Sequence, residues 1–141
     1  RLLAWYRQDQ DSQRLATIPG VGVISATALA ASVPDPGLFR SGREFAASLG
    51  LVPRQSSSGG KDRLGRISKM GDRYLRKLLV VGATSVVRRA GTSDAPAANW
   101  IRSLLERKPA RLVTVAMANK TARIVWAVLA RGESYRSPAA A

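Results

Sequence analysis

Apolar residues recur every three or four positions along much of this chain, a spacing that places them on one face of an α-helix. The strongest such pattern begins at Asp72, and the next covers about residues 110–131, where Gly132 can end the helix. Weaker patterns of the same kind cover residues 1–17 and 96–108. The apolar positions of the two strongest patterns are Leu75, Leu78, Leu79, Gly82, Ala83, Val86 and Val87, then Val113, Met117, Ile124, Val125, Val128 and Leu129.

Capping residues predict one further short helix. Ser41, with Glu44 three residues later, has the form of a capping box, and Gly50 fits the end of that helix. Residues 34–37 are rich in turn-forming residues, and the sequence contains no internal repeat and no convincing pair of strands. The pattern therefore predicts an all-α fold of five or six helices.

Residues 15–29 match a helix-hairpin-helix signature, in which apolar positions surround two glycines. Gly20 and Gly22 permit a tight turn and a close backbone approach. The N–H groups at the start of the following helix can then bind a phosphate without reading sequence. A glycine-rich corner that only packs two helices together would explain the same residues. The matching positions are Leu15, Ile18, Gly20, Val21, Gly22, Ala26 and Leu29.

Residues 51–68 have neither a helical nor an alternating period and are rich in Ser, Gly and Arg. We predict a long basic loop here, and loops of this length are usually functional or disordered. Eight cations and two acids lie between Arg54 and Lys77, and three serines, Ser56–Ser58, precede a pair of glycines.

A serine hydroxyl is a poor nucleophile unless something removes its proton. Guanidinium groups can nevertheless stabilise the charge on a phosphate under attack. From the residues alone, a flexible linker or a passive phosphate binder is the more common explanation of such a segment. The residue order of a P-loop is missing.

The charge of the chain points to a polyanionic partner. The 141 residues include 23 Lys or Arg against 9 Asp or Glu, a formal net charge of +14, which is typical of proteins that bind nucleic acid. The 22 alanines offer a second explanation, because a GC-rich genome favours both Ala and Arg. Trp5, Trp100 and Trp126 lie on apolar helix faces and are predicted to pack in the core rather than to stack on bases, because single-strand binding surfaces usually interleave aromatic residues with cations.

Several classes of site are excluded by what the sequence lacks. The chain has no Cys and no His, which rules out a disulfide scaffold, a zinc site built on those residues, a thiol nucleophile and a histidine general base. The nine acids are scattered, so no metal site is predicted. We find no apolar run of membrane-spanning length.

Five stretches together carry a resemblance to a known family. They are Leu15–Gly22 (LATIPGVG), Phe45–Gln55 (FAASLGLVPRQ), Ser57–Leu64 (SSGGKDRL), Gly65–Leu79 (GRISKMGDRYLRKLL) and Ala116–Tyr135 (AMANKTARIVWAVLARGESY). The chain resembles, over about residues 12–136, the C-terminal transposase domain of the insertion-sequence 110/116/902 family. Members of that family are recombinases guided by a bridge RNA.

This resemblance implies cleavage and rejoining of DNA through a covalent phosphoserine intermediate. The family serine lies in a Ser-Gly element after a G-L-x-P-R stretch, which places it at Ser58, with Ser57 as the next choice and then Ser56. A missing RuvC-like domain that binds Mg²⁺ would complete the active site, so the isolated chain is expected to bind nucleic acid without complete catalysis. Together with the two glycines of the helix-hairpin-helix signature, the expected phosphate or nucleic-acid contacts are Arg54, Gly59, Gly60, Lys61, Arg63, Arg66, Lys69, Arg73, Gly20 and Gly22.

The resemblance also implies partners and a domain organisation. The partners are donor and target DNA, a structured guide RNA and further copies of the chain, as a dimer and as a tetramer in the full complex. Residues 1–14 would end a linker helix from an N-terminal domain, residues 15–136 would form the transposase domain, and residues 137–141 would be a disordered tail.

The expected location is the bacterial cytoplasm, with the nucleoid and without a membrane partner. With no initiator Met and no signal peptide, the chain is expected to be part of a longer intracellular protein. Two alternatives remain. One is a non-catalytic helix-hairpin-helix module that grips the nucleic-acid backbone. The other is an assembly domain in which residues 96–131 mediate dimerisation.

Overall fold

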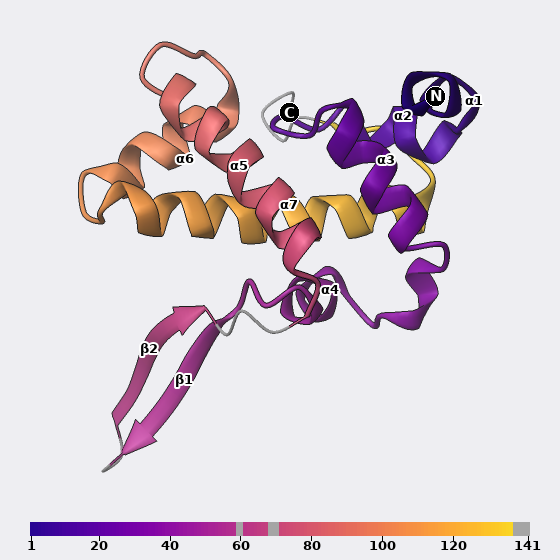
Figure 1. Ribbon diagram of the computed structural model, residues 1–141. Helices are drawn as coiled ribbons and strands as arrows, with labels where there is room; N and C mark the ends of the chain where they lie inside the picture. The colour runs from indigo at the N-terminus through magenta and orange to yellow at the C-terminus, as the bar shows by residue number, and fades with distance from the viewer. Residues whose placement is uncertain (59–60, 68–70, 137–141) are drawn as a thin grey trace.

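The computed structural model describes residues 1–58, 61–67 and 71–136, with backbone alone at 53–58, 61–67 and 96. Figure 1 shows a body of helices from which two strands project. The predominantly helical fold predicted from the apolar spacing is confirmed. The elements are α1 (Leu2–Gln8), α2 (Gln10–Leu15), α3 (Val23–Ser32), the 3₁₀-helix η1 (Pro36–Leu38), α4 (Gly42–Ser48), β1 (Pro53–Ser58), β2 (Lys61–Ile67), α5 (Arg73–Arg89), α6 (Pro96–Leu105) and α7 (Ala110–Arg131).

The body is built around α7, which runs the length of the helical part of the molecule (Figure 1). It contacts α2, α4, α5 and α6, and it ends at Gly132, whose φ of 65° is left-handed. The helix predicted over 110–131 is therefore confirmed. Of its predicted inward residues, Ile124 is half-buried. The buried side chains of α7 are Val113, Met117, Ala118, Thr121, Ala122, Val125, Val128 and Leu129.

By length and composition alone, α7 is apolar enough to cross a membrane. The expectation that no apolar stretch has membrane-spanning length is wrong for this helix. Although Lys120 and Arg123 lie within the stretch, its mean hydropathy stays as high as that of a membrane-spanning helix. The apolar side chains of α7 are used inside the protein, where the helix packs against α4 and α5. Those contacts are the ones a core helix makes.

The helix predicted to begin at Asp72 is α5, which packs on α7. The Asp72 carboxylate accepts hydrogen bonds from the backbone N–H groups of Tyr74 at 2.9 Å and Leu75 at 3.0 Å, so it caps the helix. One residue per turn is buried along its inner side, at Leu75, Leu79, Ala83 and Val87. The predicted capping at Ser41 is also confirmed, since its hydroxyl accepts from the Glu44 N–H at 3.2 Å.

The backbone of the turn before α3 packs directly against the backbone of α5, at Gly20 and Gly82. A Cβ atom added to Gly82 would lie 2.0 Å from the carbonyl oxygen of Gly20, so the position admits only glycine. Gly20 itself has a φ of 86°, a conformation that L side chains rarely adopt. The two glycines together allow α3 and α5 to come this close.

The helix predicted over residues 1–17 is interrupted at Asp9, which separates α1 from α2. Asp9 is extended, with φ −104° and ψ 111°. Its carboxylate accepts from the N–H of Ser12 at 3.0 Å and from Ser12 Oγ at 2.5 Å. A side chain that caps a new helix competes with continuation of the old one. The described residues therefore contain seven α-helices, rather than five or six, and one 3₁₀-helix.

The long loop predicted over residues 51–68 is wrong, because β1 and β2 pair as an antiparallel hairpin. Both strands are polar except for Pro53, Leu64, Gly65 and Ile67, so apolar alternation gives no signal. Backbone pairing needs no apolar side chains. The signal that was missed is the pair of glycines between the two segments. Those glycines, Lys69 and the predicted tail of residues 137–141 lie outside the described residues.

Replacing Gly82 by Ala tests the contact with Gly20. In an exposed helix, replacing Gly by Ala raises the free energy of unfolding by about 1 kcal/mol, because Ala is the better helix former. Here the new Cβ meets the Gly20 carbonyl, so we expect the free energy of unfolding to fall by more than about 2 kcal/mol. Urea denaturation followed by circular dichroism measures the change. Val81→Ala, at the exposed neighbouring position, is the control and should cost less than about 0.5 kcal/mol.

Candidate nucleic-acid interface

The hairpin, which we call the arm, brings the serines of one strand into register with charged residues of the other. Paired strands lie about 4.8 Å apart. The register shifts between Pro53 and Gln55, at the end of the arm nearest the helical body. The Cα partners in the outer part of the arm are Ser58 with Lys61, Ser57 with Asp62 and Ser56 with Arg63.

The strand that enters the arm starts from a fixed point on the body. The end of α4 is a Schellman motif, in which the Leu51 N–H donates to Ala46 O at 3.1 Å and the Gly50 N–H donates to Ala47 O at 3.0 Å. Leu51 is fully buried, and its carbonyl accepts a hydrogen bond from Asn119 Nδ2 of α7 at 3.1 Å. The arm therefore leaves the body two residues after a buried anchor.

The strand that leaves the arm returns to the same corner through Gly71. A Cβ atom on Gly71 would lie 1.8 Å from Ser48 O, and its φ is 92°, so only glycine fits there. From α5, Arg76 Nη1 donates to Leu49 O at 3.1 Å. Both ends of the arm are attached where α4, α5 and α7 meet, which sets the position of its base.

From the base of the arm, α5 runs toward α6 and carries cations on the side opposite its buried residues (Figure 1). At 100° per residue, Arg73, Lys77 and Arg88 share this side with the exposed Val81. We call these three cations the α5 stripe. Among the described side chains none of the three has a carboxylate partner, whereas ion pairs do join Arg14 to Asp11 and Arg40 to Glu44.

Only Arg73 of the α5 stripe was among the predicted contacts. Lys77 and Arg88 were missed, although they follow Arg73 by four and fifteen residues, close to whole numbers of helical turns. The signal was present in the spacing of cations on the polar side of the predicted helix.

The turn of the helix-hairpin-helix signature is held against α5. The five apolar positions of the signature are buried, and Gly20 makes the contact with Gly82, which is a packing role. Gly22 differs, because it is exposed at the start of α3 and a Cβ there would meet nothing within 4 Å. Packing thus explains Gly20, while Gly22 leaves the start of α3 open to solvent.

The predicted site residues fall into two places in the structure. The arm gathers the candidate serines with four predicted phosphate contacts, and Arg73 stands at its base. The glycine turn forms the second place, beside the middle of α5. The four predicted phosphate contacts on the arm are Arg54, Lys61, Arg63 and Arg66. For these four residues the structure describes the backbone.

The described side chains offer no ligand set for a metal ion. They contain no group of three or more Asp, Glu, His or Cys residues that could hold one. Asp9, Asp35 and Asp72 instead cap helices, and Asp11 and Glu44 pair with arginines. We assign no step of chemistry to a metal ion in this part of the chain.

A basic helical body with a serine-bearing arm is the class of domain that these features define. Residues 12–98 match the sequence model of the Transposase IS116/IS110/IS902 family. The chain belongs to this family, so the resemblance found in the sequence is confirmed at the level of the family.

Relatives with assigned names support the same conclusion. A "Probable family 20 transposase" of Pseudomonas aeruginosa is 53% identical over 136 residues, which are 96% of this chain and 40% of the relative. A "Putative transposase y4pF/y4sB" of Sinorhizobium fredii is 50% identical over 137 residues, 96% of this chain and 35% of the relative. The "Transposase for insertion sequence element IS1111A" of Coxiella burnetii is 43% identical over 135 residues, 96% and 37% respectively. The chain thus spans between 35% and 40% of the length of these relatives.

Removing cations from the α5 stripe should weaken binding to duplex DNA in a salt-dependent way. Each phosphate contact contributes about 0.9 to the slope of log K against log salt. We therefore expect the double variant Lys77→Gln, Arg88→Gln to lower that slope by up to about 2, measured by fluorescence polarisation with a duplex at several salt concentrations. The control, Arg107→Gln with Arg111→Gln, removes two exposed cations elsewhere. Equal losses in both variants would contradict a localised interface.

Proposed function

We propose that this chain is the DNA-binding, nucleophile-carrying part of a transposase that cleaves and rejoins DNA through a covalent phosphoserine intermediate. Ser58 is the proposed nucleophile, with Ser57 next and then Ser56. One observation carries the proposal: the arm sets these serines in register with residues 61–63, within the segment matched by the transposase family.

The proposed reaction conserves phosphodiester bonds and needs no external energy source. Ser58 Oγ attacks a DNA phosphorus atom, and the bond from phosphorus to one deoxyribose oxygen breaks. The serine loses its proton, and the departing oxygen takes up a proton to become a free hydroxyl. A hydroxyl of a second strand later attacks the phosphoserine, which rejoins the DNA and restores the serine.

The cations of the arm suit the charge that develops in such a reaction. Negative charge grows on the phosphate oxygens as the fifth bond forms, and fixed positive groups stabilise it. Arg54, Lys61, Arg63 and Arg66 are proposed to supply that charge, while the α5 stripe and the exposed start of α3 hold the flanking DNA backbone. The chain has no His, so no histidine of these 141 residues accepts the serine proton.

The remaining parts of the proposed complex lie outside this chain. They are an RuvC-like domain that binds Mg²⁺ through acidic residues, a structured guide RNA that pairs with donor and target DNA, and further copies of the protein, as a dimer or tetramer in the cytoplasm at the nucleoid. The dispersed carboxylates of the described residues support placing the metal elsewhere. An isolated chain is proposed to bind nucleic acid without cleaving it.

A second candidate is a helix-hairpin-helix module that binds nucleic acid without catalysis. The exposed start of α3 at Gly22 favours binding, as do the cations of the α5 stripe, which have no carboxylate partner among the side chains that the structure describes. Neither feature requires a serine. Both candidates predict salt-dependent binding, so only a covalent product separates them.

Covalent trapping tests the proposed nucleophile. The chain is produced within the full-length protein together with its guide RNA, and a nicked DNA that cannot be rejoined is added. We expect a protein–DNA adduct that mass spectrometry maps to Ser58 and that Ser58→Ala abolishes. Ser57→Ala is the matched control, because it removes a neighbouring hydroxyl of the same strand.

The outcomes separate the candidates. An adduct on Ser57 would keep the reaction and move the nucleophile by one residue. A complex that cuts DNA without any serine adduct would overturn the proposed chemistry and leave the arm as a binding element. Retained DNA binding by Ser58→Ala, measured on the same samples, would show that the loss of adduct is not a loss of affinity.

A further inference from the structure

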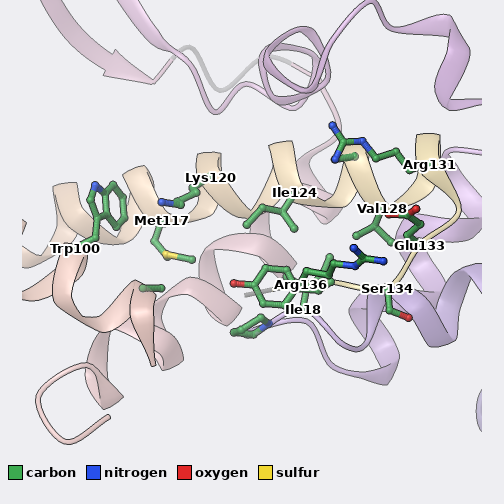
Figure 2. A pocket seen from close by; sticks show the side chains of 14 residues that line it. Ile18, Trp100, Met117, Lys120, Ile124, Val128, Arg131, Glu133, Ser134 and Arg136 are labelled. Atoms are coloured by element: carbon green, nitrogen blue, oxygen red, sulfur yellow. The ribbon is translucent and has the colours of Figure 1, made fainter. Parts of the chain in front are cut away.

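A groove of about 440 Å³ lies on the side of α7 away from the arm's attachment to α4 (Figure 2). Its other walls come from the start of α6, from the turn residues Ile18 and Pro19, and from the segment 133–136 that follows α7. This volume is within the range of sites that bury a small organic group. None of the predicted site residues whose side chains the structure describes lines it.

The floor of the groove is one continuous row of α7 side chains. Met117, Ile124 and Val128 recur at intervals of seven and four residues, which is the spacing of a single helix face. Met117 and Val128 are nearly buried, while Ile124 is half-buried. The floor is therefore apolar, and Ile124 is the residue of this row that offers surface to an occupant.

One wall is fixed to the opposite end of the chain. The backbone N–H of Tyr135 donates to Thr17 Oγ1 at 2.9 Å, which holds the segment after α7 against the turn that contains Ile18. The half-buried Tyr135 side chain lines the groove next to this bond.

The far end of the groove is formed by an aromatic ring paired with a cation. Trp100, which was predicted to pack in the core, is half-buried and lines the groove. Lys120 Nζ lies 4.4 Å from the centre of its ring. The core prediction is wrong for Trp5, which is 42% exposed, whereas Trp100 packs against the core from its half-buried position. Trp126 is half-buried and donates through Nε1 to Pro36 O at 3.0 Å.

The rim of the groove carries net positive charge. Lys120 stands at the Trp100 end, and Arg131 and Arg136 stand near the other end, against the single acid Glu133 (Figure 2). Among the described side chains, none of the three cations is paired with a carboxylate. An occupant with an apolar, flat centre and anionic flanks would match both features.

We propose that this groove binds an unstacked base of single-stranded nucleic acid, with the neighbouring phosphates on Lys120, Arg131 and Arg136. Cationic grooves with aromatic side chains are the usual means of binding single strands, because every base has a π-face to stack. An acidic peptide would satisfy the rim equally, but the aromatic residues at both ends favour a base. The inference rests on the proposed nucleic-acid binding and adds to it a second, base-dependent site.

Base dependence is measured with two oligonucleotides of equal charge. Fluorescence polarisation compares a short oligothymidylate with an oligonucleotide of the same length whose sugars lack bases. The wild-type chain should bind the oligothymidylate at least about fivefold more tightly, the effect of one stacked base. Photo-crosslinking with a 4-thiothymidine oligonucleotide should give an adduct at Trp100 or Tyr135.

Two variants assign this preference to the groove. Ala127→Phe fills the groove from its α7 side, and Tyr135→Ala removes an aromatic wall while keeping the backbone bond to Thr17. Each should reduce the preference to less than twofold and leave binding of the base-free strand unchanged. Trp5→Ala removes an exposed tryptophan outside the groove and should keep the full preference. Circular dichroism confirms that each variant is folded.

Contrary outcomes are distinct from one another. Equal affinity of the wild type for both oligonucleotides, or crosslinks that all map outside the groove, would overturn the base site and leave the proposed DNA binding intact. Failure to bind any nucleic acid at low salt would overturn the proposed function itself. Sedimentation that shows a dimer lost on Ala127→Phe would assign the groove to a second copy, and competition by an acidic peptide alone would assign it to a protein partner. Either result would overturn the proposal.

Discussion

The contact between Gly20 and Gly82 determines how the parts of the body are arranged. It joins the turn before α3 to the middle of α5 with no side chain between them. Since α5 also packs on α7, this contact fixes the turn relative to both helices. The wall of the groove formed by Ile18, the exposed start of α3 and the α5 stripe all take their positions from it. A larger residue at either glycine would displace features that are proposed to contact nucleic acid.

The body and the arm have different roles in this arrangement. The body is held by apolar packing around α7 and fixes the spacing of the cationic and apolar surfaces. The arm carries the candidate serines beyond that core and is attached at one corner, through the buried Leu51 and the tight approach of Gly71 to Ser48. A reactive segment on such an arm can enter a site built partly by another chain or domain, while its base stays fixed.

Much of the fold was predictable because each long helix buries a regular row of residues, as α5 does from Leu75 to Val87. The arm was not predictable in this way, because its strands pair through the backbone and their sequence has no apolar alternation. The break at Asp9 depended on a cap that apolar spacing does not report. The candidate serines and the cations near them were predicted from the sequence and stay a prediction. The groove was not predicted, since its walls come from Ile18 and Pro19, α6, α7 and the segment 133–136.

The hydrogen bond between Tyr135 and Thr17 joins residues 118 positions apart. Contacts of such long sequence separation carry a large loop-closure cost and form late in folding. During synthesis, which proceeds from the N-terminus, the turn and α3 exist long before the segment that closes over them. The groove is therefore completed only after residues 133–136 have been synthesised. The order of synthesis thus delays any binding in the groove until the segment after α7 has followed the turn out of the ribosome.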